Sequence, residues 1–146
     1  MFKCLLCDKT FNTVVEARNH IIKDHNAKRN IDYFIEYIVP IDMNKLKEEI
    51  ERNLHCCRGL KCVDITLRHQ PIYPILEIEI SDCRSEITLD LIECIIKDIV
   101  PILKKFGIPE NKMIVNGVSD IIQPEDYCPA IVISINTMGV WENETQ

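Results

Sequence analysis

Beyond the first 30 residues, the apolar positions of the chain follow two different periods. In four stretches they alternate with polar positions, as in half-buried β-strands. In two others they recur every three or four residues, as on one face of an amphipathic helix. The predicted strands lie at residues 31–39, around 63–67 and 76–80, and at 130–136, and the predicted helices run from residue 43 to 54 and from 89 to 106. The pattern therefore predicts an α+β fold.

Residues with strong local preferences mark the ends of both predicted helices. Asp42 is suited to cap the first helix, and Ser85 or Thr88 the second, because their side-chain oxygens accept from free backbone N–H groups. Gly107 is expected to end the second helix, and Pro101 to kink or break its last turns, since proline clashes with the preceding turn. Residues 108–128 show no clear period, although 113–115 could form an extra short strand.

The order strand, helix, strand, strand, helix, strand is typical of the ferredoxin-like sandwich. We expect one such βαββαβ domain at residues 31–136, with a four-stranded antiparallel sheet that carries both helices on one face. A length of 146 residues is sufficient for this domain and a small appendage. Residues 137–146 form a polar tail that is expected to be frayed.

The first 25 residues carry a set of metal-ligating side chains. Cys4 and Cys7 are separated by two residues, twelve residues then precede His20, and four more precede His25. This spacing suits one tetrahedral zinc ion, with thiolates from a tight turn and imidazoles from successive turns of one helix.

The segment resembles a C2H2-type zinc finger, and the resemblance covers residues 2–25. Phe2 and Phe11 correspond to its apolar scaffold. The resemblance implies a short hairpin, then a helix from near Val14 to His25, and folding that depends on bound zinc. The chain departs from the family at Ala17, where a large aliphatic residue is usual. We therefore expect a thin core.

By the same resemblance, some side chains of the finger would face DNA. The base-contacting positions would be Thr13, Glu16 and Asn19, and the further candidates for contact with nucleic acid or a partner are Lys9, Arg18 and Lys23. No arginine stands at the base-contacting positions to bind guanine, and a single finger reads only about three base pairs. A docking or structural finger is the alternative.

Charge is unevenly distributed along the chain. Residues 1–30 contain six basic and three acidic residues, a net charge of +3, whereas the whole chain carries −6 and the rest therefore −9. Only the basic end is electrostatically suited to phosphate, and the acidic body should repel nucleic acid. We divide the chain into a finger at residues 1–26, a linker at 27–30, and the body.

Six of the eight cysteines lie outside the finger, and four of these should meet at one end of the ferredoxin-like sheet. They are Cys56, Cys57, Cys62 and Cys83. Three states remain open for them: reduced thiols, a disulfide, for which Cys62 and Cys83 come within reach, or a second metal or redox site. Reduced thiols are the default inside a cell.

The outward face of the predicted sheet gathers four carboxylates, which are Glu36, Asp64, Glu77 and Glu79. Such a cluster could hold Mg²⁺, but a solvated sheet face would show the same pattern. The chain contains no phosphate-binding loop, dinucleotide-binding fingerprint or catalytic triad. An enzymatic role therefore stays open but is the less favoured one.

The sequence favours a zinc-binding intracellular interaction module. Its finger would contact nucleic acid or a partner protein, and its acidic body would mediate self-association, as in a homodimer, or partner binding. The alternative is a small enzyme or ligand-binding regulator that uses the acidic face or the cysteine-rich end, with a purely structural finger. No apolar run approaches the roughly 18 residues needed to span a membrane, and no secretory signal fits before the finger. A cytoplasmic location is expected.

Overall fold

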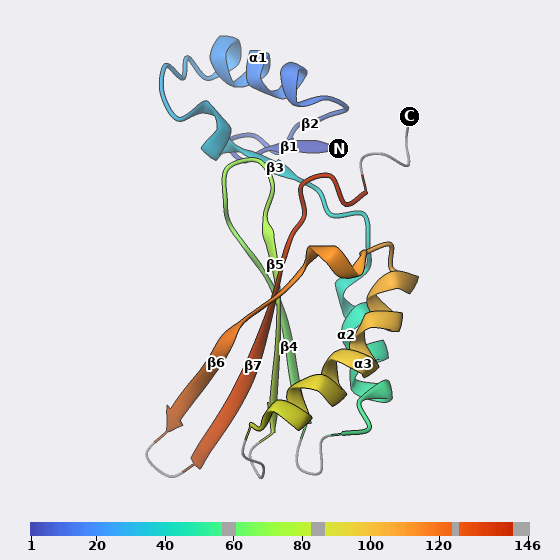
Figure 1. The fold of residues 1–146 in the computed structure, drawn as a ribbon. Helices are drawn as coiled ribbons and strands as arrows, with labels where there is room; N and C mark the ends of the chain where they lie inside the picture. Colours follow the sequence, from blue (N-terminus) through green and yellow to red (C-terminus); the bar gives the residue numbers. More distant parts are fainter. Residues whose placement is uncertain (57–60, 83–86, 124–125, 142–146) are drawn as a thin grey trace. The chain divides into compact units, whose positions relative to one another are not determined.

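The computed structural model describes residues 1–56, 61–82, 87–123 and 126–141, with the backbone alone at 61–62, 82, 117–123 and 126–129. The chain divides into two compact units (Figure 1). The first comprises residues 1–40 and 67–75, and the second begins at residue 41 and contains the rest. Mixed helices and antiparallel sheets confirm the α+β class.

The first unit is built on a three-stranded sheet and one helix. Strands β1 (Phe2–Cys4) and β2 (Thr10–Phe11) form an antiparallel hairpin in which Phe2 lies opposite Phe11. Helix α1 (Val14–Asp24) follows, and the Thr13 hydroxyl caps it by accepting from the Glu16 N–H at 3.2 Å. The predicted hairpin and helix are therefore present.

The third strand of this sheet comes from the segment that the sequence assigns to the body. Residues Ile31–Phe34 form a 3₁₀ helix, η1, and Ile35–Tyr37 form β3. Strand β3 pairs antiparallel with β1, with Ile35 opposite Cys4, so the sheet order is β2-β1-β3. The prediction that residues 31–39 form the first strand of a ferredoxin-like sheet is therefore wrong. Alternation identifies a strand but not the strand with which it pairs.

The turn between β4 (Lys61–Arg68) and β5 (Ile75–Asp82) also belongs to the first unit. The Ile72 N–H donates to the Asp32 carbonyl at 3.2 Å, and the Ile72 carbonyl accepts from the Tyr37 N–H at 2.6 Å. Ile72 is buried and has a φ of +65°, which β-branched residues rarely adopt. Such a conformation persists only where the surroundings impose it, so these two hydrogen bonds hold the turn against η1 and β3.

The core of the first unit extends beyond the finger motif. Helix α1 contacts η1 and β3 as well as the hairpin, and Ala17, Ile21 and Ile35 are completely buried. The Tyr37 ring packs against the rings of Phe2 and Tyr73, with centroids 5.4 and 5.5 Å away. The contacts with η1, β3 and Tyr73 compensate for the small side chain at Ala17. The core of this unit is therefore larger than the thin core expected of residues 2–25 alone.

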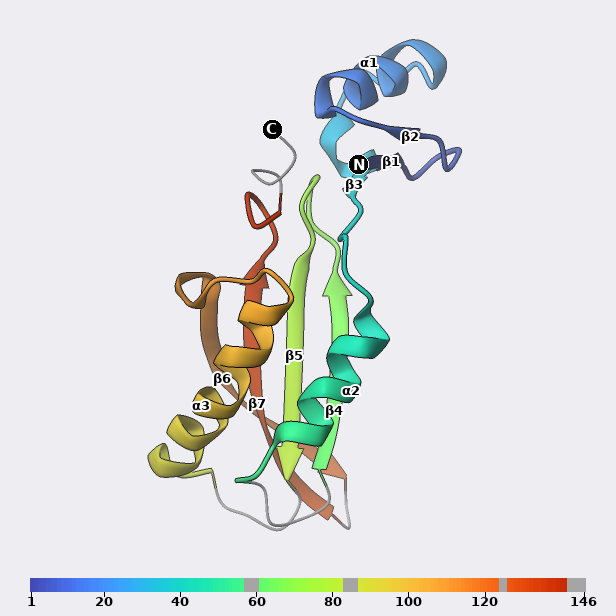
Figure 2. The same ribbon diagram turned by 90° about the vertical axis from the view of Figure 1, so that its right-hand side faces the viewer.

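The second unit is a four-stranded antiparallel sheet with two helices. The sheet contains β4, β5, β6 (Met113–Gln123) and β7 (Asp126–Asn136), in the order β4-β5-β7-β6. Helices α2 (Met43–Asn53) and α3 (Leu89–Lys105) lie on the same face of this sheet, as expected (Figure 2). The layer between the helices and the sheet contains completely buried residues from both, which include Leu46, Ile50, Ile99, Leu103, Leu76, Ile78 and Ile133.

Two of the predicted capping residues occupy the expected places, and the third, Ser85, lies outside the described residues. The Asp42 carboxylate accepts from the N–H groups of Asn44 and Lys45, and the Thr88 hydroxyl accepts from the Leu91 N–H. Helix α3 does not end at Pro101 but continues to Lys105. Gly107 follows with a φ of +83°, a left-handed conformation that favours glycine after a helix.

The fourth strand of the sheet is β6, where the sequence predicts at most a short strand at 113–115. Strand β6 pairs antiparallel with β7, with Ile114 opposite Ser134, and the register shifts between Val115 and Val118. Strand β6 lies at the edge of the sheet, and β7 lies between β5 and β6, so the ferredoxin-like strand order is not observed. The coarser prediction, a four-stranded antiparallel sheet with two helices on one face, agrees with the structure.

The segment after β7 is packed up to residue 141, unlike the frayed tail that its polar composition suggests. Thr137 is completely buried, and Trp141 is 5% exposed. The Trp141 Nε1–H donates to the Phe106 carbonyl at 3.0 Å, and its indole lies where a Cβ at position 107 would make close contact. A hydrogen bond to the free carbonyl at the end of α3 thus attaches this segment to the second unit.

Candidate metal centre

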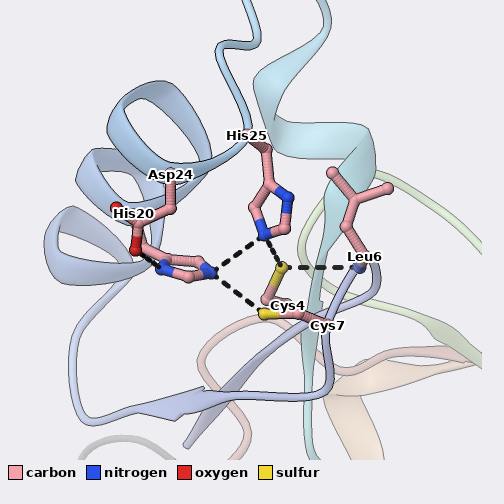
Figure 3. A network of polar contacts seen from close by, with 6 residues as sticks. All are labelled: Cys4, Leu6, Cys7, His20, Asp24 and His25. Atoms are coloured by element: carbon pink, nitrogen blue, oxygen red, sulfur yellow. Dashed lines mark hydrogen bonds and ion pairs between the residues drawn. The ribbon is translucent and has the colours of Figure 1, made fainter.

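Four side chains of the first unit converge on one point. Cys4 ends β1, Cys7 lies in the turn before β2, His20 is on the buried face of α1, and His25 follows the helix. The turn is closed by the Cys4 N–H, which donates to the Lys9 carbonyl at 2.8 Å, and by the Asp8 N–H, which donates to the Cys4 carbonyl at 2.9 Å. The ligand atoms lie within 4.8 Å of one another, so the cluster could hold a metal ion (Figure 3).

The distances within the cluster suit a tetrahedral site. The Sγ of Cys7 is 3.1 Å from the Nε2 of His20, and the Sγ of Cys4 is 3.6 Å from the Nε2 of His25. The two Nε2 atoms are 3.2 Å apart. Zinc–sulfur bonds of about 2.3 Å and zinc–nitrogen bonds of about 2.0 Å imply edges of about 3.5 Å between sulfur and nitrogen and about 3.3 Å between the nitrogens. The geometry is compatible with a C2H2-like zinc site.

Neighbouring groups orient two of the four ligands. The Asp24 carboxylate lies 2.8 Å from the Nδ1 of His20, one turn along α1 (Figure 3). A hydrogen bond from Nδ1–H leaves the lone pair of Nε2 directed at the other ligands, an arrangement common among metal-binding histidines. The Leu6 N–H donates to the Sγ of Cys4 at 3.4 Å. Both contacts favour the metal-binding state of the side chain that they touch.

Burial affects the protonation of one of the candidate ligands. Cys4 is completely buried, and desolvation raises the pKa of its thiol above the usual value, although hydrogen bonds from the Leu6 and Cys7 amides act in the opposite direction. Without a cation the thiol therefore retains its proton more strongly. A metal ion compensates the charge of the thiolate and displaces that proton, so metal binding at neutral pH should release protons.

The other finger residues singled out from the sequence lie outside this cluster. Glu16 and Asn19 are exposed on α1, and Lys9 and Lys23 are exposed as well. Arg18 instead pairs with Asp32, with Nε 2.8 Å from one carboxylate oxygen and Nη2 3.3 Å from the other. This hydrogen bond raises the pKa of Arg18, and the guanidinium is engaged within its own unit.

Cys56 of the body lies beside a cysteine that the sequence analysis did not single out. Cys56 forms a disulfide with Cys94 of α3, and Asp98 lies beside them. Cys57, Cys83 and the side chain of Cys62 lie outside the described residues. The sequence reasoning missed Cys94 and Asp98 because the ferredoxin-like pattern placed Cys83 next to Cys56. The signal that could have found them is the four-residue spacing of Cys94 and Asp98 on a predicted helix.

The carboxylates of the predicted acidic face do not form a comparable cluster. Among the described residues, two groups of side chains have ligand atoms close enough for a metal ion, and neither contains Glu36, Asp64, Glu77 or Glu79. Glu36 belongs to β3 of the first unit, whereas Asp64, Glu77 and Glu79 belong to β4 and β5. The proposed Mg²⁺ site on this face therefore has no support in the structure.

The chain was compared with protein families, curated proteins and solved structures. No family model, no curated protein and no solved structure matches it. Within the described part of the chain, no helix has the length and apolar character required to cross a membrane. The case for a function therefore depends on the geometry of the sites.

Proposed function

We propose that this protein is a zinc-binding interaction module, in which zinc holds together a finger that docks a partner protein. The observation that supports zinc most directly is the donor set, with two thiolates and two imidazoles at tetrahedral distances. Two thiolates with two imidazoles are typical of structural zinc sites, in which protein ligands fill all four positions. The ion would stabilise the fold and would not carry out catalysis.

A protein partner is favoured over nucleic acid by the exposed side of α1. Val15 and Ile22 are 59% and 44% exposed and lie two turns apart on one stripe of the helix, with Asn19 between them. Thr13, a base-contacting position by resemblance, uses its hydroxyl to cap the helix. Arg18, which could bind phosphate, is paired with Asp32. An apolar stripe suits an apolar partner surface, and the net charge of +3 over residues 1–30 favours acidic neighbours around it.

Substitution of Asp24 tests the assignment of the metal centre. We expect Asp24→Ala to weaken zinc binding about tenfold, because His20 loses the group that fixes its tautomer and ring orientation. Asp24→Asn retains an acceptor oxygen and should lose less affinity. Competition with a chromophoric chelator measures both variants in the full chain under reducing conditions. Glu16→Ala, which removes a carboxylate elsewhere on α1, is the control, and an Asp24→Ala variant that binds zinc as tightly as the wild type would contradict the assignment.

Substitution of the apolar stripe tests the docking surface. Proximity labelling with the full chain would supply candidate partners, and calorimetry on each purified pair would measure binding. We expect the double substitution Val15→Ser and Ile22→Ser to lower the affinity for the true partner at least tenfold, since each buried aliphatic side chain contributes about 1.5 kcal/mol or more. Zinc content should not change. Ile38→Ser, which replaces an exposed apolar residue of the same unit, should bind normally.

Salt dependence distinguishes the two classes of partner. Docking through an apolar stripe should change little between 50 and 200 mM salt, whereas a complex that neutralises several phosphates weakens by orders of magnitude over a comparable range. Tight binding of a DNA or RNA oligonucleotide that falls steeply with salt and survives the double substitution would overturn the docking proposal. Self-association of the acidic body stays a prediction, and analytical ultracentrifugation would test it.

A further inference from the structure

A second group of metal-ligating side chains lies where α2 ends beside α3. Cys56 comes three residues after the end of α2, and Cys94 and Asp98 are one helical turn apart on α3. The Cα atoms of Cys56 and Cys94 are 6.0 Å apart, and their sulfur atoms form a disulfide. The two Sγ atoms and a carboxylate oxygen of Asp98 lie within 4.8 Å of one another, and all three residues are half-buried. The group is therefore compact, but solvent molecules can approach it.

Asp98 holds the backbone next to Cys56 close to α3 by a hydrogen bond that does not depend on the disulfide. One oxygen of Asp98 accepts a hydrogen bond from the His55 N–H at 3.0 Å. The same oxygen lies 3.2 Å from the Sγ of Cys56, so that a reduced Cys56 thiol can donate to it. After reduction, the two thiols and the carboxylate should therefore stay close together.

The charges of this group limit the states that it can occupy. Two thiolates beside a carboxylate would place three negative charges within 4.8 Å, which is costly at a half-buried position. Formation of the disulfide removes both thiolates. Binding of a divalent cation compensates them instead, and thiolate ligands favour Zn²⁺ over Mg²⁺ or Ca²⁺. Three protein ligands leave the fourth tetrahedral position to water.

We propose that Cys56, Cys94 and Asp98 form a redox-controlled zinc site, separate from the finger. In the reduced form, both thiols release a proton and the thiolates bind Zn²⁺ together with the Asp98 carboxylate. A low-molecular-weight disulfide, such as oxidised glutathione, oxidises the site. One cysteine sulfur attacks this disulfide and expels a first thiolate, and the second cysteine sulfur then attacks the mixed disulfide and expels another. The protein gains one disulfide, two thiols form from the oxidant, and zinc is released.

Zinc stoichiometry in the full chain tests the proposal. By native mass spectrometry, we expect the reduced protein to bind two zinc ions. The protein is then treated with oxidised glutathione in the presence of zinc, so that zinc occupies Cys4 and Cys7 and protects them. The oxidised protein should bind one zinc ion. The denatured, zinc-free chain should then show six titratable thiols in place of eight, and peptide mapping should join Cys56 to Cys94.

Substitutions assign the site to the three residues. Cys94→Ser should bind one zinc ion in both redox states, whereas Cys128→Ser, a matched loss of one thiol, should still bind two when reduced. Asp98→Asn should weaken the second ion about tenfold while the disulfide still forms. Retention of the first zinc ion and of the helical circular dichroism shows that a variant is folded. Should Cys94→Ser fail to fold, Cys56→Ser, which lies outside the helices, provides the same test.

Three results would overturn the proposal. The first is a single zinc ion bound to the reduced wild-type chain. The second is an oxidised chain in which Cys56 is joined to a cysteine other than Cys94. The third is an Asp98→Asn variant that binds the second ion as tightly as the wild type, because the carboxylate would then not be a ligand. None of these results bears on the finger, whose zinc ion is counted separately.

Discussion

Removal of zinc from the full chain should unfold α1 and the β1–β2 hairpin, while the four-stranded sheet and its two helices stay folded. Without the ion, the thiol of Cys4 and the imidazole of His20 are buried side chains that point at other ligands and not at an apolar core. Zinc binding to finger peptides contributes an apparent free energy of about 10–16 kcal/mol at pH 7. The free energy of unfolding of a typical small domain is about 5–15 kcal/mol. The contribution of zinc is therefore as large as the whole stability of such a domain.

Amide NMR spectra of the full chain measure this effect. Chelation should collapse the dispersed resonances of residues 1–30, and His20→Ala should have the same effect even with zinc present. His69→Ala is the matched control, because His69 is exposed and belongs to the same unit. If α1 kept its dispersed resonances in the metal-free chain, packing without the ion would be sufficient, and the metal centre would lose its structural role.

Replacement of Tyr37 by alanine should destabilise the finger although Tyr37 lies twelve residues beyond His25. The side chain is 5% exposed, and its ring packs against Phe2 and Tyr73. Truncation of a buried aromatic residue costs about 3 kcal/mol or more. Because folding and zinc binding are coupled, a loss of about 3 kcal/mol should weaken the apparent zinc affinity about 100-fold.

Tyr33→Ala is the matched control for this prediction. Tyr33 precedes the same strand and is 52% exposed, so its removal should change zinc affinity by less than about threefold. Chelator competition and denaturation of the zinc-loaded chain measure both variants. Equal zinc affinities for Tyr37→Ala and Tyr33→Ala would show that the finger folds independently of β3.

The cluster of candidate metal ligands could be predicted from sequence because its determinants are local. Cys4, Cys7, His20 and His25 lie within 22 residues, and a hairpin followed by one helix is sufficient to bring them together. Helix ends could be predicted for the same reason: Asp42 and Thr88 accept from backbone groups two or three residues away. The contact of Asp24 with His20 is equally local, since the two residues are one helical turn apart.

Pairings between distant segments could not be predicted in this way. An alternating pattern at residues 31–39 indicates a strand, but the same pattern fits either sheet, and the structure places β3 beside β1. The fourth strand of the larger sheet, β6, has no clear alternation. The sequence also could not show that Cys94 lies beside Cys56, because their proximity depends on how α2 packs against α3.

Spacing along the chain is therefore enough to specify the cluster of two cysteines and two histidines, the ends of the helices and the α+β class, since each depends on contacts within a few turns of backbone. The extension of the finger by β3 and Ile72, the strand order of the larger sheet and the group formed by Cys56, Cys94 and Asp98 follow from long-range packing. In such packing, several segments with similar hydrophobic patterns compete for the same neighbours. The free energy of the whole fold determines which of these segments pair, and the pairing cannot be read from any local sequence pattern.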